Sequence, residues 1–186
     1  NKVYDGTTTA TLSGGVLVGV IATDASNVTL TQSGAFANKD AGTAKAVNIT
    51  STLAGTEANN YSLTQPSGLT GNITAKTLTV TADNDARFYG QTDTAGYQGV
   101  SYSGFVNGET AAGLLSSGAL TAPTVTRTIA AGTTGNDAAT YTGVLVPAGG
   151  TASNYSFTYV PGDYTVVPAN QLLVRMNPLT TTYGTT

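Results

Sequence analysis

The sequence predicts a mostly β protein built from tandem modules, and three observations carry this prediction. First, residues 60–90 recur without a gap as residues 154–184, and self-similarity at a fixed period is typical of repeat architectures. Second, only 9% of the residues are charged, so the helix formers Glu, Lys and Arg are scarce. Third, the chain is rich in Thr, Val and Tyr, which favour strands.

The repeat predicts where the modules begin and end. Residues 60–61 (Asn-Tyr) return as residues 154–155, and residues 89–90 (Tyr-Gly) return as residues 183–184. We therefore expect a first module at 1–75 that lacks its first strand, a second at 76–169, and the first strand of a third repeat at 170–186. Because the chain starts inside one repeat and stops inside another, we expect it to be a fragment. No Gly/Ser-rich or Pro-rich linker separates the modules, which predicts a semi-rigid rod.

Period-two alternation of apolar and polar residues predicts the strands. It occurs around Val28, Val47, Leu78, Tyr141 and Tyr155, as expected for strands with one buried and one wet face. Residues 161–162 (Pro-Gly) predict a hairpin turn between the last two strands of the second module.

The least strand-like stretches, residues 20–26 and 109–117, predict one short helical segment in each module. In the second module we expect Asn107 to cap this segment and Glu109 to lie near its positive end. Residues 13–16 align with residues 103–106, which places Gly15 opposite Phe105 and predicts a less well-filled core in the first module.

The order of the predicted elements is strand, strand, short helix and several further strands. This order is typical of a β-grasp-like module with one short helical segment. An immunoglobulin-like β-sandwich of similar size is the alternative.

Composition excludes several functions. The chain has no His and no Cys, so the commonest general base, the commonest metal ligand and all thiol chemistry are absent. With a net charge of −3 and no cluster of basic residues, it lacks the usual signature of nucleic-acid or anionic-membrane binding. No apolar run is long enough to span a membrane. We expect no enzyme activity, no catalytic residue, no cofactor, no metal, no nucleic-acid partner and no membrane insertion.

Two local motifs have competing interpretations. Residues 83–85 (Asp-Asn-Asp) offer oxygen ligands for calcium, but residues 177–179 at the equivalent repeat position have no acidic group, so a turn stabilised by these side chains is favoured. Tyr61 and Tyr155 each follow an Asn in an Asn-x-Ser or Asn-x-Thr triplet. We favour a structural role over glycosylation, with the ring in the core and the hydroxyl on a backbone group, as in a tyrosine corner.

The Tyr and Gly residues fall into two groups. Those that recur or mark the repeats are predicted to be structural: Tyr4, Asp5, Gly6, Tyr61, Tyr89, Gly90, Tyr155, Tyr183 and Gly184. Three tyrosines have no such role and are candidates for a ligand-facing surface: Tyr97, Tyr102 and Tyr141.

The motifs resemble known repeat domains along essentially the whole chain. Residues 3–6 (Val-Tyr-Asp-Gly) resemble the YDG signature, and residues 88–90, 104–109, 154–156 and 162–166 resemble the MBG type with its Tyr-Gly motif. Such repeats occur in large bacterial surface adhesins, including filamentous-haemagglutinin-like exoproteins of two-partner secretion. The resemblance implies an extracellular protein, on the bacterial cell surface or secreted, that acts as a stalk without catalysis.

Three functional hypotheses follow from the sequence. The first is a non-catalytic structural stalk repeat of an adhesin, with neighbouring repeats of the same protein as its partners. The second is a module that binds a host or matrix glycan or protein through the candidate tyrosines. The third is a subunit of a strand-complemented surface filament, in which residues 172–176 of one molecule complete the first module of the next.

Overall fold

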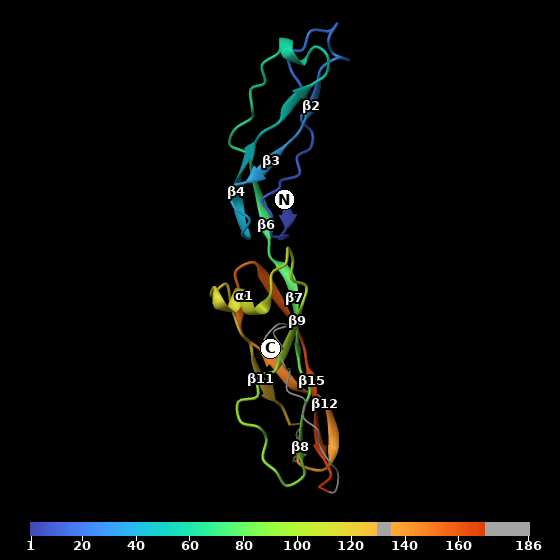
Figure 1. The fold of residues 1–186 in the computed structure, drawn as a ribbon, viewed down its shortest axis with the longest axis vertical. Helices are drawn as coiled ribbons and strands as arrows, with labels where there is room; N and C mark the ends of the chain where they lie inside the picture. The colour runs from blue at the N-terminus through green and yellow to red at the C-terminus, as the bar shows by residue number, and fades with distance from the viewer. Residues whose placement is uncertain (130–134, 170–186) are drawn as a thin grey trace, which may run out of the picture. The chain divides into compact units, whose positions relative to one another are not determined.

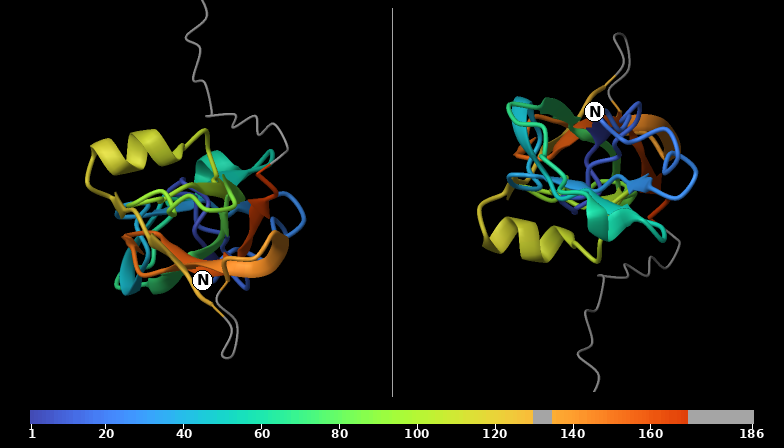
Figure 2. Two further views of the ribbon diagram at one scale, coloured as in Figure 1. Left: turned by 90° about the horizontal axis from the view of Figure 1, so that it is seen from below. Right: turned by 90° about the horizontal axis from the view of Figure 1, so that it is seen from above.

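The computed structural model describes residues 1–129 and 135–169. Most of the secondary structure in these residues is β, with a single short α-helix, α1 (Ala111–Ser116), and one turn of 3₁₀ helix, η1 (Ala58–Asn60) (Figure 1). The predicted mostly β class is therefore confirmed. Both views in Figure 2 show α1 on the outside of the strands, and none of its residues is buried.

The chain divides into two compact units. Unit 1 consists of Asn1–Leu78, Gly104–Thr121 and Thr151–Phe157. Unit 2 consists of Thr79–Ser103, Ala122–Gly150 and Thr158–Thr186, of which residues 130–134 and 170–186 lie outside the described part. Unit 1 thus combines residues 1–75 with three segments from the sequence beyond them.

Unit 1 contains a four-stranded sheet and two small two-stranded sheets. The four-stranded sheet has the order β1 (Lys2–Val3), β6 (Thr70–Thr74), β4 (Gly42–Ile49) and β3 (Gly34–Phe36). The small sheets pair β2 (Thr29–Thr31) with β5 (Thr52–Ala54), and β10 (Leu120–Thr121) with β13 (Thr151–Ala152). Tyr4, Phe36 and Ile73 are buried beside the larger sheet.

Unit 2 contains a four-stranded sheet in the order β11 (Thr124–Arg127), β12 (Ala139–Ala148), β15 (Gly162–Val167) and β8 (Asp85–Phe88). Its core consists of Ala82, Val125, Leu145, Tyr164 and Val166. The inward side chains of β15 alternate with half-buried ones, as the period of a strand requires.

A further three-stranded sheet has the order β14 (Tyr155–Val160), β7 (Lys76–Ala82) and β9 (Val100–Ser103). β7 is its central strand and pairs antiparallel with β9. Leu78 and Val80 on β7 are fully buried, and Ala82 is almost so. The predicted strands around Val28, Val47, Leu78, Tyr141 and Tyr155 correspond to β2, β4, β7, β12 and β14.

The helical predictions are partly wrong. In the second module α1 forms where expected, but Thr110 is its N-cap and accepts a hydrogen bond from the Gly113 amide at 3.2 Å. Asn107 instead has a positive φ of 51° and lies in a turn before the helix. In the first module residues 22–27 form turns and not a helix, while η1 lies further along the chain.

The hairpin predicted at residues 161–162 is also wrong. β14 and β15 follow one another in sequence but belong to different sheets. Gly162 allows this crossing because a Cβ at that position would lie 2.4 Å from the carbonyl oxygen of Ala82. Close backbone approach, and not a tight turn, is the reason for glycine here.

One parallel strand pair recurs in the two sheets. β1 runs parallel to β6, and β8 runs parallel to β15. The residue after each first strand makes the same bond, since the Tyr4 amide donates to the Thr74 carbonyl and the Tyr89 amide to the Val167 carbonyl, both at 2.8 Å. These parallel pairs depart from the antiparallel sheets of an immunoglobulin-like sandwich.

Several predictions concern residues outside the described part: Tyr183, Gly184, the third-repeat strand at 170–186 and the self-association segment at 172–176. Within the described residues, no helix is long and apolar enough to cross a membrane.

Candidate functional site

Four side chains of unit 1 from distant parts of the sequence meet around one carboxylate. We call Tyr4, Lys39, Glu109 and Tyr155 the Tyr–Glu cluster. Glu109 accepts a hydrogen bond from the Tyr4 hydroxyl at 2.6 Å and from the Tyr155 hydroxyl at 2.5 Å, one on each carboxylate oxygen. Lys39 Nζ adds an ion pair to the same carboxylate at 3.1 Å. Short hydrogen bonds to a charged acceptor are the stronger kind.

Aromatic packing surrounds this carboxylate. The rings of Tyr4 and Tyr155 are edge to face with centroids 5.4 Å apart, and Phe105 packs on Tyr155 in the same way at 5.6 Å. Tyr4 and Tyr155 are both buried. The Tyr155 hydroxyl also accepts a hydrogen bond from the Val106 amide at 3.2 Å. The Tyr155 hydroxyl thus contacts a backbone group, as it does in a tyrosine corner, and additionally binds Glu109.

Backbone contacts reinforce the cluster. Asn107 Nδ2 donates to the carbonyl of Gly6 at 3.2 Å. Gly6 has a φ of +77°, and a Cβ there would lie 2.6 Å from the Asn107 Cβ. The predicted structural role of Gly6 thus has two physical reasons, a left-handed backbone and close approach to Asn107.

Asn154 also connects segments that are distant in the sequence. Its Oδ1 accepts from the Ala41 amide at 2.8 Å, and its Nδ2 donates to Asp40 at 3.2 Å. Its own carbonyl accepts from the Lys76 amide at 3.0 Å. Both ends of the Asn154 side-chain amide are therefore engaged in hydrogen bonds within unit 1.

The surroundings hold the cluster in one charge state. Burial would raise the pKa of Glu109, but hydrogen bonds from Tyr155, Tyr4 and Lys39 outweigh it and lower that pKa below its ordinary value. Burial, followed by the hydrogen bond to Glu109, raises the pKa of Tyr155 and of Tyr4. At neutral pH the cluster is an ionised carboxylate between two protonated phenols.

A second set of residues in unit 1 repeats this geometry. The Tyr61 hydroxyl donates to Asp24 at 2.8 Å and accepts from the Ile21 amide at 3.2 Å. In both sets the acid lies three residues after the amide, and its own amide closes a turn: Asp24 N to Ile21 O at 2.9 Å, and Glu109 N to Val106 O at 3.0 Å. Asp24 and Tyr61 thus correspond to Glu109 and Tyr155.

This correspondence corrects the predicted alignment of residues 13–16 with 103–106. Asp24 and Glu109 are 85 positions apart, as are Gly19 and Gly104, both with positive φ, and Tyr4 and Tyr89. At this spacing Val20, and not Gly15, takes the place of Phe105. The signal present in the sequence is Gly followed five residues later by an acid, with a Val or Ile three residues before the acid.

The two sets differ in what covers them. Tyr155 is buried and Asn154 is half-buried, whereas Tyr61 is half-buried and Asn60 is exposed. Tyr89, the counterpart of Tyr4, is 54% exposed, against 1% for Tyr4. Asp5, the remaining residue of the first Tyr-Asp-Gly motif, binds Lys2 at 2.7 Å and the amide of Thr7 at 2.9 Å.

The three candidate ligand-facing tyrosines lie in unit 2 and are all half-buried. Tyr97 and Tyr141 pack against the core of that unit, and their hydroxyls donate to the carbonyls of Asp83 at 3.0 Å and Asp137 at 2.9 Å. Burial raises the pKa of Tyr102. No contact with a ligand tests these residues, so the ligand-facing surface remains a prediction.

Unit 2 has its own charged cluster, around Asp93. This carboxylate accepts from Arg87 Nε at 2.7 Å, from Arg127 Nη1 at 2.7 Å and from the Tyr164 hydroxyl at 3.1 Å. The Arg127 guanidinium also lies 3.9 Å from the centroid of the Tyr164 ring, a cation–π contact. Burial alone would raise the pKa of Asp93, but the hydrogen bonds lower it. The network joins β8 and β11 with the loop that follows β8.

The side chains of residues 83–85 stabilise backbone and neighbouring strands. Asn84 Oδ1 accepts from the Asp163 amide at 2.7 Å, and Asp83 accepts from the Ser101 hydroxyl at 2.5 Å. Across residues 1–129 and 135–169, no three acidic side chains are grouped as a metal site would require.

Fold and clusters together define the class of protein: tandem β-rich modules whose shared tyrosine and acid positions hold chain segments together. More specifically, residues 1–68 match the family model of the YDG domain, and residues 78–165 match that of the MBG domain (YGX type). The chain therefore contains a YDG domain followed by an MBG domain. Domains of these two kinds are typically found in bacterial surface proteins. Searches of curated proteins and of solved structures gave no match.

Proposed function

We propose that this chain is a non-catalytic structural stalk repeat of an extracellular bacterial adhesin, and that it spaces or presents a binding region carried elsewhere. The two domain matches support the surface context, because such domains are typical of bacterial surface proteins. Neighbouring repeats of the same protein are its principal partners.

The observation that carries the proposal is the Tyr–Glu cluster. Tyr4 and Lys39 lie within the YDG match, and Glu109 and Tyr155 lie within the MBG match, yet all four belong to one compact unit. A largely buried carboxylate, its side chain 14% exposed, with three charge-assisted partners resists separation of the segments that supply them. Successive domains that share a buried cluster are suited to keeping a fixed position relative to one another along a stalk.

Small-angle X-ray scattering of the chain at low concentration tests the stalk. We expect an elongated particle, and Gly6→Asp, which disrupts the approach to Asn107, should broaden the distance distribution. A compact particle would refute the stalk. The surface location is tested by antibody labelling of intact bacteria that produce the parent protein, where labelling only after lysis would contradict it.

A further inference from the structure

The YDG domain has an open groove at the position where the MBG domain has its central strand. In the MBG domain β7 lies between β9 and β14. By the spacings that relate the domains, residues 15–18 correspond to β9 and residues 61–66 to β14. Neither segment is a strand, and within the described part of the chain the backbone groups of residues 16–18 and 62–66 make no hydrogen bond to other backbone groups.

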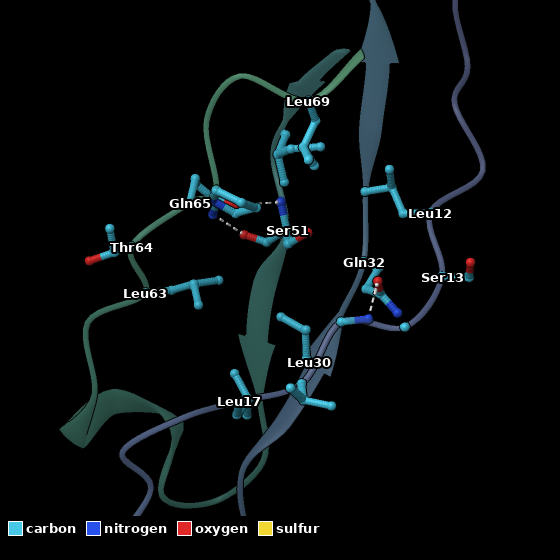
Figure 3. A pocket seen from close by; sticks show the side chains of 15 residues that line it. Leu12, Ser13, Leu17, Leu30, Gln32, Ser51, Leu63, Thr64, Gln65 and Leu69 are labelled. Atoms are coloured by element: carbon cyan, nitrogen blue, oxygen red, sulfur yellow. Dashed lines mark hydrogen bonds between the residues drawn. The ribbon is translucent and has the colours of Figure 1, made fainter. Parts of the chain in front are cut away.

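Two adjoining cavities occupy the space between these segments. One of about 230 Å³ is lined by both of them together with strand residues such as Leu30 and Ile49. Figure 3 shows Leu12 and Leu63 on opposite sides of it, with Leu17 and Leu30 between them. The other, of about 280 Å³, shares Val16, Leu17, Leu63 and Thr64 with the first and reaches Tyr61.

The rim of this groove is apolar and exposed. Val16 is 78% exposed, Val18 is 92% exposed and Ile21 is 64% exposed. Clustered exposure of this kind indicates a surface that another chain covers. Unpaired backbone on both sides of a slot is the arrangement that β-strand addition satisfies.

The MBG domain shows which segment fits such a slot. There it is filled by Lys76–Ala82, whose residues Leu78 and Val80 are fully buried. That strand directly follows β6, the partner of the residues before Tyr4, so the strand and the Tyr4 side chain reach the MBG domain together. Insertion of the strand into the slot and the hydrogen bond from Tyr4 to Glu109 are therefore two parts of one docking geometry.

The chain carries a second donor of this type. Ninety-four positions after Leu78, Val80 and Ala82 stand Leu172, Val174 and Met176. These follow β15, which pairs with the residues before the exposed Tyr89. By sequence, residues 172–176 and Tyr89 thus correspond to both parts of the donor, and the YDG domain has both parts of the acceptor.

We propose that residues 170–176 of a second copy enter the YDG groove as a β-strand, with Tyr89 of that copy donating to Asp24 beside Tyr61. Copies then associate head to tail. The proposal rests on the stacking of repeats proposed above and names the surface by which repeats stack. The YDG domain has Ala22 at the position of Asn107, so no side-chain amide donates to the incoming backbone as Asn107 does to Gly6. The contact is therefore weaker than the Tyr–Glu cluster.

Sedimentation velocity of the full chain tests this docking, at concentrations up to about 1 mM, the effective concentration typical of linked modules. We expect concentration-dependent dimers and longer species. Val18→Glu blocks the groove and Leu172→Glu blocks the donor, and each should leave a folded monomer by circular dichroism. Val160→Glu, which adds the same charge at an exposed valine on β14, should associate like the wild type.

Mixing the two blocked variants separates this mechanism from general stickiness. Val18→Glu retains its donor and Leu172→Glu retains its groove, so an equimolar mixture should form a single heterodimer and nothing longer. Tyr89→Phe should weaken wild-type association about tenfold, the loss expected for one hydrogen bond to a carboxylate. A monomeric wild type, a monomeric mixture, or equal weakening by Val160→Glu would overturn the proposal. Scattering at low concentration is unaffected by these outcomes, so the stalk can fail or stand separately.

Discussion

Replacing Tyr4 by phenylalanine removes one hydroxyl from a carboxylate that has three partners. The Tyr4 ring is 1% exposed and the Glu109 side chain 14% exposed, so water does not readily replace the missing bond. A hydrogen bond to a charged group contributes about 1.5–3 kcal/mol. We expect Tyr4→Phe to lower the free energy of unfolding by about 2 kcal/mol, since the ring still packs on Tyr155.

Glu109→Gln should cost more, about 3 kcal/mol, because an amide offers one acceptor oxygen to two tyrosines and loses the ion pair with Lys39. The double variant isolates the interaction. If the 2.6 Å bond between Tyr4 and Glu109 is the main interaction that both substitutions remove, the coupling energy should be about 1–2 kcal/mol, within the usual range for neighbouring residues that touch.

Urea unfolding followed by circular dichroism and tyrosine fluorescence measures all four proteins of this cycle. Tyr61→Phe is the control, because Tyr61, the counterpart of Tyr155, also donates a hydrogen bond to a carboxylate, that of Asp24, but at a more exposed position, and should have the smaller effect. Additive single changes, or a larger loss from Tyr61→Phe than from Tyr4→Phe, would refute the inference that the buried cluster holds the two domains' segments together.

Four further predictions concern backbone strain, pH dependence and ligand binding. Gly6→Ala should destabilise unit 1 by about 2–3 kcal/mol, because backbone strain and a clash with Asn107 add together. The control is Gly14→Ala, where φ is similar but no neighbour lies within 4 Å, and it should cost about 1 kcal/mol. Equal losses of stability in the two variants would show that the clash is relieved. The pKa values of Glu109 and Asp93 are lowered in the folded protein. Their contribution to stability is complete above the unfolded pKa of about 4 and is lost as the pH falls through the folded pKa values. Glu109→Gln should therefore flatten the acid side of the stability profile, as measured by urea unfolding at a series of pH values. On the alkaline side, burial, followed by the hydrogen bond to Asp93, raises the pKa of Tyr164 to about 12. The wild type should therefore lose stability between about pH 10 and pH 12, and Tyr164→Phe should remove this loss. An unchanged alkaline profile in Tyr164→Phe would contradict the prediction. If Tyr97, Tyr102 and Tyr141 form a ligand surface, a glycan array should detect binding that Tyr97→Ala abolishes, and an array with no signal for the wild type would reject that surface.

The strands were predictable because their signal is local. Alternation around Val47, Leu78 and Tyr155 reflects one buried face, and each of these segments is a strand. The recurring Asn-Tyr pair singled out Tyr155 as a position to inspect, and its ring is buried. The single helix was located correctly but its cap was not, because Thr110 and Asn107 both suit a turn and only tertiary contact with Gly6 distinguishes them.

The role of Glu109 could not be predicted from its neighbourhood. Its position just before a helix suggests a dipole interaction, but its partners Tyr4 and Tyr155 lie 105 and 46 positions away. The sequence contains the spacing of 85 residues that pairs Glu109 with Asp24. This spacing was obscured by the spacing of 94 residues that relates later segments, since loop lengths differ between the domains. Which strands cross between sheets is equally non-local, as the glycine at 162 shows.

The parallel pairing of β1 with β6, and of β8 with β15, has a mechanical consequence. A pull on residue 2 and on residue 74 in opposite directions runs along two adjacent strands that point the same way. The bonds between them are then loaded in shear, all at once, and cannot open one after another as in a peeled hairpin. The evenly spaced, slanted bonds of a parallel pair share such a load. Force applied in this way would therefore meet its resistance in these two parallel strand pairs.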